Sequence, residues 1–211
     1  KAVRPTSIMG ASKRICEKII MHYATKYKQD ISFSIVRFGN VLNSSGSVIP
    51  IFQEQIDKGG PVTVTDARAM RYFMSIEEAA QLVIQSSALE NNFGIYILDM
   101  GNPVKIIDIA KKMILLSGKK IFYKNDNNIH DTIKIDIIGL NKGEKLFEEL
   151  LITNEIINTS HTKIKKSIET EKFNNNLIDD LNNLISLPII NNEDSVNFLI
   201  QHVEEFRYEK K

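Results

Sequence analysis

A helical pattern that runs directly into a short apolar strand is the feature of this sequence that most restricts its fold. Pro5-Thr6-Ser7 supplies helix-starting residues, and the helical pattern extends from Ile8 to about Tyr27. Residues at the spacing of one helix face are expected to face a core: Ile8, Ala11, Ile15, Ile19 and Tyr23. Ile31–Phe38 follows as a buried strand that ends at Gly39-Asn40. This order is typical of a parallel, doubly wound sheet, so an α/β fold is predicted.

The same alternation continues along most of the chain. Strict alternation of apolar and polar residues predicts one half-exposed strand, Thr132–Ile137. Ser75 is expected to cap the helix that follows it. The other predicted helices are about Val48–Lys58, Ser75–Leu89, Ile106–Leu116, Asn175–Ser186 and Glu193–Arg207, and the other predicted strands are Val62–Thr65 and Gly94–Leu98.

Charge and cysteine content exclude several classes of protein. Lys plus Arg (27) nearly balances Asp plus Glu (26), so the net charge of +1 does not favour nucleic acid as a partner. Cys16 is the only cysteine, which rules out an intrachain disulfide and fits a reducing compartment. No apolar run approaches the roughly 20 residues of a membrane span. The histidines lack ligand-like spacing, so no metal site is expected: His22, His130, His161 and His202.

Met9 and Lys13 stand four residues apart on the first predicted helix, so they share one face. Alone, this spacing is typical of a core methionine and a solvated lysine. Further blocks follow it in a fixed order: Val36–Leu42, Gly46–Phe52, Thr63–Asp66, Met70–Ala79, Leu98–Gly101 and Gly143–Leu150. Together with Pro5–Arg14, they resemble the extended short-chain dehydrogenases that act on nucleotide sugars. Among these the chain is most similar to the capsule-polysaccharide (CapD-like) UDP-N-acetylglucosamine 4,6-dehydratases, strongly over residues 1–150 and weakly in the tail.

The resemblance implies a reaction and a cofactor. Enzymes of this family use tightly held NAD: hydride leaves sugar C4, water is eliminated across C5–C6, and hydride returns at C6. The implied substrate is a UDP-N-acetylhexosamine, and the product is a 4-keto-6-deoxy sugar nucleotide for surface polysaccharide. The implied fold is the C-terminal part of a Rossmann-like doubly wound sheet (residues 1–45) and a smaller α/β substrate-binding region (residues 46–211). Residues of about 75–100 are expected to return to the Rossmann sheet.

The family's pattern assigns cofactor and catalytic roles to five positions. Lys13 would bind the nicotinamide ribose, while Phe38 and Gly39 would lie near the nicotinamide. Met9 stands where most short-chain dehydrogenases carry a catalytic tyrosine, whose pKa the lysine lowers. A thioether has no exchangeable proton, and a methionine here is similar to the larger, membrane-anchored members. Lys1 matches the lysine of a Thr-Asp-Lys motif whose Asp-Lys pair assists the elimination.

The same pattern assigns substrate contacts. Asn40 would form a hydrogen bond with the nucleotide diphosphate or the sugar. The helix start at Ser47 and Val48 would offer N–H groups to the pyrophosphate. Arg71 would pair with that pyrophosphate, and Glu144 of the Gly-Glu-Lys block is a further predicted substrate-binding residue. The alternatives are a strand-ending turn for Asn40, a surface ion pair for Arg71 and a helix-start carboxylate for Glu144.

One substitution departs from the family in the C-terminal block. Where the family has an arginine on the substrate pyrophosphate, this chain has Asn141, so that contact is lost unless Lys142 replaces it as a point charge.

The start of the chain at Lys1, without an initiator methionine, suggests a piece of a longer protein whose missing part holds the glycine-rich dinucleotide fingerprint. The piece alone is then expected to be inactive. The expected location is cytoplasmic, or the cytoplasmic face of the inner membrane for the full-length protein, and a homo-oligomer is expected. A nucleotide-sugar epimerase, a C5-inverting dehydratase and a non-catalytic nucleotide-sugar-binding remnant are the rival interpretations.

Overall fold

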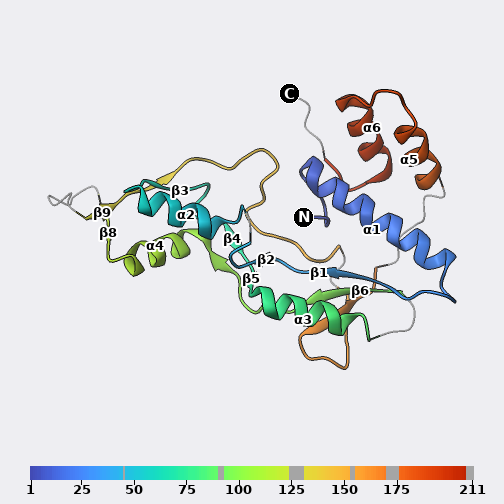
Figure 1. Ribbon diagram of the computed structural model, residues 1–211, viewed down its shortest axis with the longest axis horizontal. Coiled ribbons are helices and arrows are strands. Elements are labelled where there is room, and N and C mark those ends of the chain that lie inside the picture. The colour runs from blue at the N-terminus through green and yellow to red at the C-terminus, as the bar shows by residue number, and fades with distance from the viewer. Residues whose placement is uncertain (45, 90–92, 124–130, 153–154, 170–175, 208–211) are drawn as a thin grey trace. The chain divides into compact units, whose positions relative to one another are not determined.

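The chain forms two compact units in the computed structural model (Figure 1). The structure describes residues 1–44, 46–89, 93–123, 131–152, 155–169 and 176–207. Unit 1 consists of Lys1–Phe38, Gln81–Asp99 and Glu149–Lys211, and unit 2 of Gly39–Ala80 and Met100–Glu148.

Unit 1 is built on a four-stranded sheet with the order β1-β6-β12-β11. The central pair, β1 (Phe33–Arg37) and β6 (Phe93–Leu98), is parallel, which confirms the predicted fold class. On the other side of β6, β12 (Ile164–Ser167) runs antiparallel and pairs with β11 (Ile156–Asn158). The burial of nearly the whole of β6 explains its continuous apolar sequence.

Helix α1 (Ile8–Lys26) is buried on two sides within unit 1. Met21 packs with Ile35 of β1 and Ile95 of β6, which fixes the helix to the sheet. Nearer its start, Ala11 and Ile15 pack against the C-terminal helices α5 (Leu177–Ile185) and α6 (Asn192–His202). That second core cluster also contains Leu177, Leu199, Val203 and Phe206.

Unit 2 has its own core between two helices and several short strands. Phe52 and Ile56 of α2 (Val48–Asp57) pack with Ala110 and Ile114 of α4 (Ile106–Leu116) and with Val62 of β3. Its strands pair as β3 (Val62–Val64) with β10 (Ile135–Ile137), β2 (Asn40–Val41) with β5 (Phe73–Met74), β4 (Met70–Arg71) with β7 (Val104–Lys105), and β8 (Lys120–Ile121) with β9 (Thr132–Ile133).

The chain passes from unit 2 to unit 1 within α3 (Ile76–Ser86). As predicted, Ser75 caps this helix: its Oγ accepts a hydrogen bond from the N–H of Glu78 at 3.1 Å. In the described part of the chain, no helix has both the length and the apolar character of a membrane span.

Three expectations from the sequence differ from the structure. Thr132–Ile137 is not one strand, because the chain changes neighbours at Lys134, pairing first with β8 and then with β3. Ile8, expected in the core, is 46% exposed, since the packing begins one turn later. The predicted helix Glu193–Arg207 ends at His202, where Val203 leaves helical geometry.

The two units also divide the chain differently from the expected boundaries. Unit 1 ends its first segment at Phe38 rather than at residue 45, and it contains residues 149–211, which we expected in the substrate-binding region. The physical reason is the apolar packing of α5 and α6 on α1. The functional assignment of the units stays a prediction.

Candidate functional site

Three predicted residues gather at the start of α1 in unit 1. Met9 is 54% exposed and Lys13 is exposed one turn further along the helix. Gly10 lies between them and has no room for a side chain: an added Cβ would lie 2.7 Å from the carbonyl oxygen of Lys1. Ser7 caps the helix by accepting a hydrogen bond from the N–H of Gly10 at 3.1 Å. Lys1 is therefore held beside the helix turn that presents Met9.

The segment after β1 carries the next three predicted residues. Phe38 directly follows the buried end of β1, and Asn40 begins β2, where its N–H donates to the carbonyl of Tyr72 at 2.9 Å. A Cβ on Gly39 would lie 2.8 Å from Cβ of Tyr72 and 3.0 Å from Sδ of Met100. Only glycine fits there, so the close approach of Tyr72 and Met100 accounts for Gly39 without any ligand.

Ser47 and Val48 stand at the N-terminus of α2, in unit 2. Ser47 is the N-cap residue, yet its side chain makes no capping bond, and its Oγ is buried with no hydrogen-bond partner. The first turn of α2 has no acidic residue. This helix end therefore offers N–H groups and an unused hydroxyl, which is the donor set that suits an anion.

Arg71 is buried and is bound to a neighbouring segment of unit 2. Its Nη1 donates to the carbonyls of Met70 (2.7 Å) and Leu146 (3.0 Å), and its Nη2 donates to that of Lys145 (2.7 Å). The carboxylates of Glu144 and Glu148 lie 3.5 and 3.6 Å from the guanidinium. Arg71 thus fastens residues 144–148 to β4.

The carboxylate of Glu144 is hydrogen-bonded within a turn. Its Oε2 accepts from the backbone N–H and the side-chain amide of Asn141, each at 3.1 Å, and its Oε1 accepts from the hydroxyl of Thr65 at 2.8 Å. The structure therefore brings Arg71 and Glu144 together. Lys142 is exposed in the same turn. Thr65, which is not among the predicted site residues, supports Glu144.

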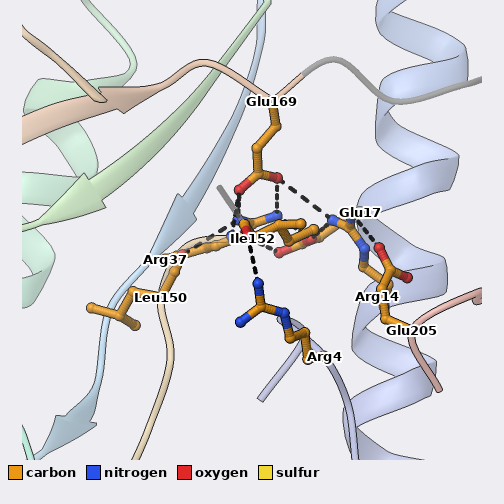
Figure 2. A network of polar contacts seen from close by, with 8 residues as sticks. All are labelled: Arg4, Arg14, Glu17, Arg37, Leu150, Ile152, Glu169 and Glu205. Atoms are coloured by element: carbon orange, nitrogen blue, oxygen red, sulfur yellow. Dashed lines mark hydrogen bonds and ion pairs between the residues drawn. The ribbon is translucent and has the colours of Figure 1, made fainter. Parts of the chain in front are cut away.

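Sequence reasoning missed a buried ion network in unit 1, shown in Figure 2. Arg37 donates through Nε and Nη2 to Glu17 (both 2.8 Å) and through Nη1 and Nη2 to Glu169 (2.6 and 2.9 Å). Arg14, whose side chain is 0% exposed, lies 2.6 Å from Glu17, 4.0 Å from Glu169 and 3.6 Å from Glu205. Two arginines are thus shared among three carboxylates from α1 and the C-terminal part of the chain.

The charges of this network stabilise one another. Burial works against the charge of Arg37, but hydrogen bonds to Glu17 and Glu169 outweigh it and raise the pKa of the guanidinium. For Glu169, burial alone would raise the pKa of the carboxyl group. Hydrogen bonds from Arg37 and from the N–H of Ile152, together with the charge of Arg37, instead hold this pKa below its ordinary value. One signal in the sequence could have revealed the network: Arg14 lies three residues from Ala11, on the apolar side of α1.

The ring of His202 is fully buried in unit 1, with Nε2 3.1 Å from Oδ2 of Asp180. His130 lies outside the described residues. Within the described ranges, no group of three or more His, Cys, Asp or Glu could hold a metal ion.

A family model described as "Polysaccharide biosynthesis protein" matches residues 1–170. The capsular polysaccharide biosynthesis protein CapD of Staphylococcus aureus is 51% identical over 156 residues, which are 74% of this chain and 24% of that protein. A UDP-glucose 4-epimerase of Rickettsia bellii is 32% identical over 157 residues, or 74% of this chain and 42% of the relative.

Among solved structures, Pen from Bacillus thuringiensis aligns with a TM-score of 0.60 and 36% identity. The alignment covers 71% of this chain and 44% of that protein. The chain therefore spans less than half the length of each of these three proteins.

Proposed function

The chain belongs to the polysaccharide biosynthesis protein family, and from this premise we propose that the whole protein is an NAD-dependent UDP-N-acetylhexosamine 4,6-dehydratase. The product would be a 4-keto-6-deoxy sugar nucleotide for surface polysaccharide, made by a cytoplasmic catalytic region. The similarity to a capsular polysaccharide biosynthesis protein over three quarters of the chain supports this proposal.

The start of α1 is the observation that carries the proposal. Met9 and Lys13 are both exposed on one face, and the backbone of Lys1 lies against Gly10 between them. A buried methionine, with the lysine on a different face, would have indicated an ordinary core helix. An exposed pair beside a second lysine instead forms a surface on which a ligand can lie.

These residues fit a dinucleotide. NAD, when bound, would accept a hydride from the sugar and return it. The amine of Lys13, with three N–H donors and an exposed position, suits the hydroxyls of a ribose. Met9 offers an apolar, polarizable side chain and no proton. Proton transfer in the elimination is therefore assigned to Lys1 and its partners rather than to position 9.

The substrate diphosphate is assigned to the N-terminus of α2. Ser47 has a buried hydroxyl with no partner, and the helix end adds N–H groups with the favourable sign of the dipole. Asn40 and the exposed Lys142 are the further proposed contacts. Arg71 would join them only if it exchanged its contacts with Glu144 and Glu148 for the phosphate.

The test is product analysis with the whole protein. Incubation with UDP-N-acetylglucosamine should give a 4-keto-6-deoxy product by NMR, and Lys13→Ala should abolish its formation. Arg68→Ala is a control, because Arg68 is exposed and its ion pair is with the nearby Asp66. Unchanged turnover in Lys13→Ala would overturn the assignment.

An epimerase is the second candidate, favoured by the 32% identity to a UDP-glucose 4-epimerase. The same experiment separates the two, because an epimerase retains the 6-hydroxyl and inverts C4, whereas a dehydratase loses the 6-hydroxyl. A whole protein that binds the sugar nucleotide and converts none of it would instead identify a non-catalytic remnant.

A further inference from the structure

The buried ion network joins the two segments that carry the proposed cofactor contacts of unit 1. Glu17 lies on α1, one helical turn beyond Lys13. Arg37 is the last residue of β1 and directly precedes Phe38. The two side chains form a bidentate pair, Nε to Oε1 and Nη2 to Oε2, each at 2.8 Å. This geometry fixes orientation as well as distance.

The pair is held from the other side by Glu169, which follows β12. Glu169 accepts twice from Arg37 and once from the N–H of Ile152 at 3.2 Å, and its side chain is 2% exposed. In Figure 2 the side chain of Glu169 points from the opposite side toward Arg37, with Arg14 beside it. With both carboxylates in place, Arg37 can neither turn nor move along its strand without breaking a buried ion pair.

Apolar packing alone leaves this part of the site less restricted. The contacts of α1 with β1 and β6 run through Met21, two turns beyond Lys13, while Ala11 and Ile15 pack on α5 and α6. The ion pair of Glu17 with Arg37 connects α1 with β1 one helical turn from Lys13, nearer than the packing of Met21.

We propose that Glu17 and Arg37, completed by Glu169, are positioning residues for the cofactor, which set Lys13 on α1 relative to Phe38 at the end of β1. This inference rests on the proposed function, because it presumes that Lys13 and Phe38 contact NAD. Glu17 and Arg37 are both buried and bonded to each other, so neither is assigned a direct contact with the cofactor. Loosening the pair should displace a cofactor contact without removing one.

Glu17→Gln in the whole protein tests the proposal, since it keeps the shape of the side chain and removes its charge. The NAD dissociation constant should rise about tenfold, which corresponds to a loss of about 1.4 kcal/mol of binding free energy. The KM for the sugar nucleotide should change less than twofold. Glu149→Gln is the matched control, because it makes the same change in an ion pair whose partners are 38% and 55% exposed. Its NAD affinity should stay within twofold.

Structural and positioning roles give different readouts in this experiment. A purely structural role would lower the midpoint of thermal unfolding and leave the NAD dissociation constant, measured well below that midpoint, unchanged; this result would overturn the proposal. If Glu17→Gln fails to fold, Arg37→Lys carries the same test. It keeps both charges but cannot form the bidentate pair, so NAD affinity should fall by a smaller factor, and an unchanged affinity would again overturn the proposal.

Failure of this inference is distinguishable from failure of the proposed function. If Lys13→Ala weakens NAD binding and Glu17→Gln does not, the proposed site stands and the positioning role fails. If Lys13→Ala leaves NAD binding unchanged, the cofactor assignment itself fails.

Discussion

Glu169→Gln should strongly destabilise unit 1. Glu169 accepts two hydrogen bonds from Arg37 and one from Ile152, lies 4.0 Å from Arg14 and is 2% exposed in its side chain. Removing one partner of a buried ion pair typically costs about 3–5 kcal/mol. The glutamine retains one acceptor oxygen, so we expect a cost at the lower end, about 3 kcal/mol. In a chain of this size each kcal/mol lowers the melting temperature by about 2–4 °C, so the melting temperature should fall by about 6–12 °C.

Thermal unfolding followed by circular dichroism at several pH values measures this effect. The pKa of Glu169 in the fold lies below its ordinary value of 4.5, so its ionised form contributes stability above that pH. This contribution is lost as pH falls through the folded pKa, and the difference between wild type and Glu169→Gln should therefore shrink below about pH 4.5. Glu149→Gln, in the exposed pair with Arg4, should cost less than about 1 kcal/mol. A difference at pH 7 no larger than that of this control would refute the reasoning.

Three further predictions concern other parts of the chain. Phe52→Ala should lower the free energy of unfolding, measured with urea, by about 3–5 kcal/mol, because Phe52 is 1% exposed in the core of unit 2. As a control, Ile51→Ala at the exposed neighbouring position should lower it by less than about 0.5 kcal/mol. Arg71→Met should speed hydrogen exchange at the N–H of Met70, which donates to the carbonyl of Leu146 beside the guanidinium; unchanged exchange would contradict the fastening role of Arg71. Met9→Tyr in the whole protein should not raise the initial rate of turnover, and an increase above twofold would show that tyrosine chemistry suits this site.

The elements that depend on local sequence could be predicted closely. The helix over Ile106–Leu116 agrees at both ends, because its apolar spacing and the turn at Gly118 are contained in a short window. The cap at Ser75 is equally local, since its hydroxyl reaches an N–H three residues away. A parallel sheet followed from the alternation of helices and apolar strands. Its central pair, β1 with β6, comes from the structure.

The features that could not be predicted depend on contacts between residues far apart in the chain. Arg37 and Glu169 are separated by 132 positions, and nothing in either local pattern identifies the other as a partner. The helical patterns after about residue 154 predicted two helices but gave no reason to place them on α1. Only the packing of Leu199 and Val203 against Ala11 and Ile15 shows where they belong. The polar network then follows, because burying these helices on α1 encloses charges that need partners.

Asn141 shows how a departure from a family pattern changes meaning once its contacts are known. From the sequence it meant only a lost positive charge near the substrate. In the structure its carbonyl accepts from the N–H of Glu144 at 3.0 Å, while its own N–H and side-chain amide donate to the Glu144 carboxylate. Gly143, at a φ of 75°, completes the turn. The hydrogen bonds of Asn141 thus stabilise the turn that contains Lys142. On the proposed function, Lys142 is then the exposed cation of this turn that could contact a diphosphate, beside the proposed contacts at the N-terminus of α2.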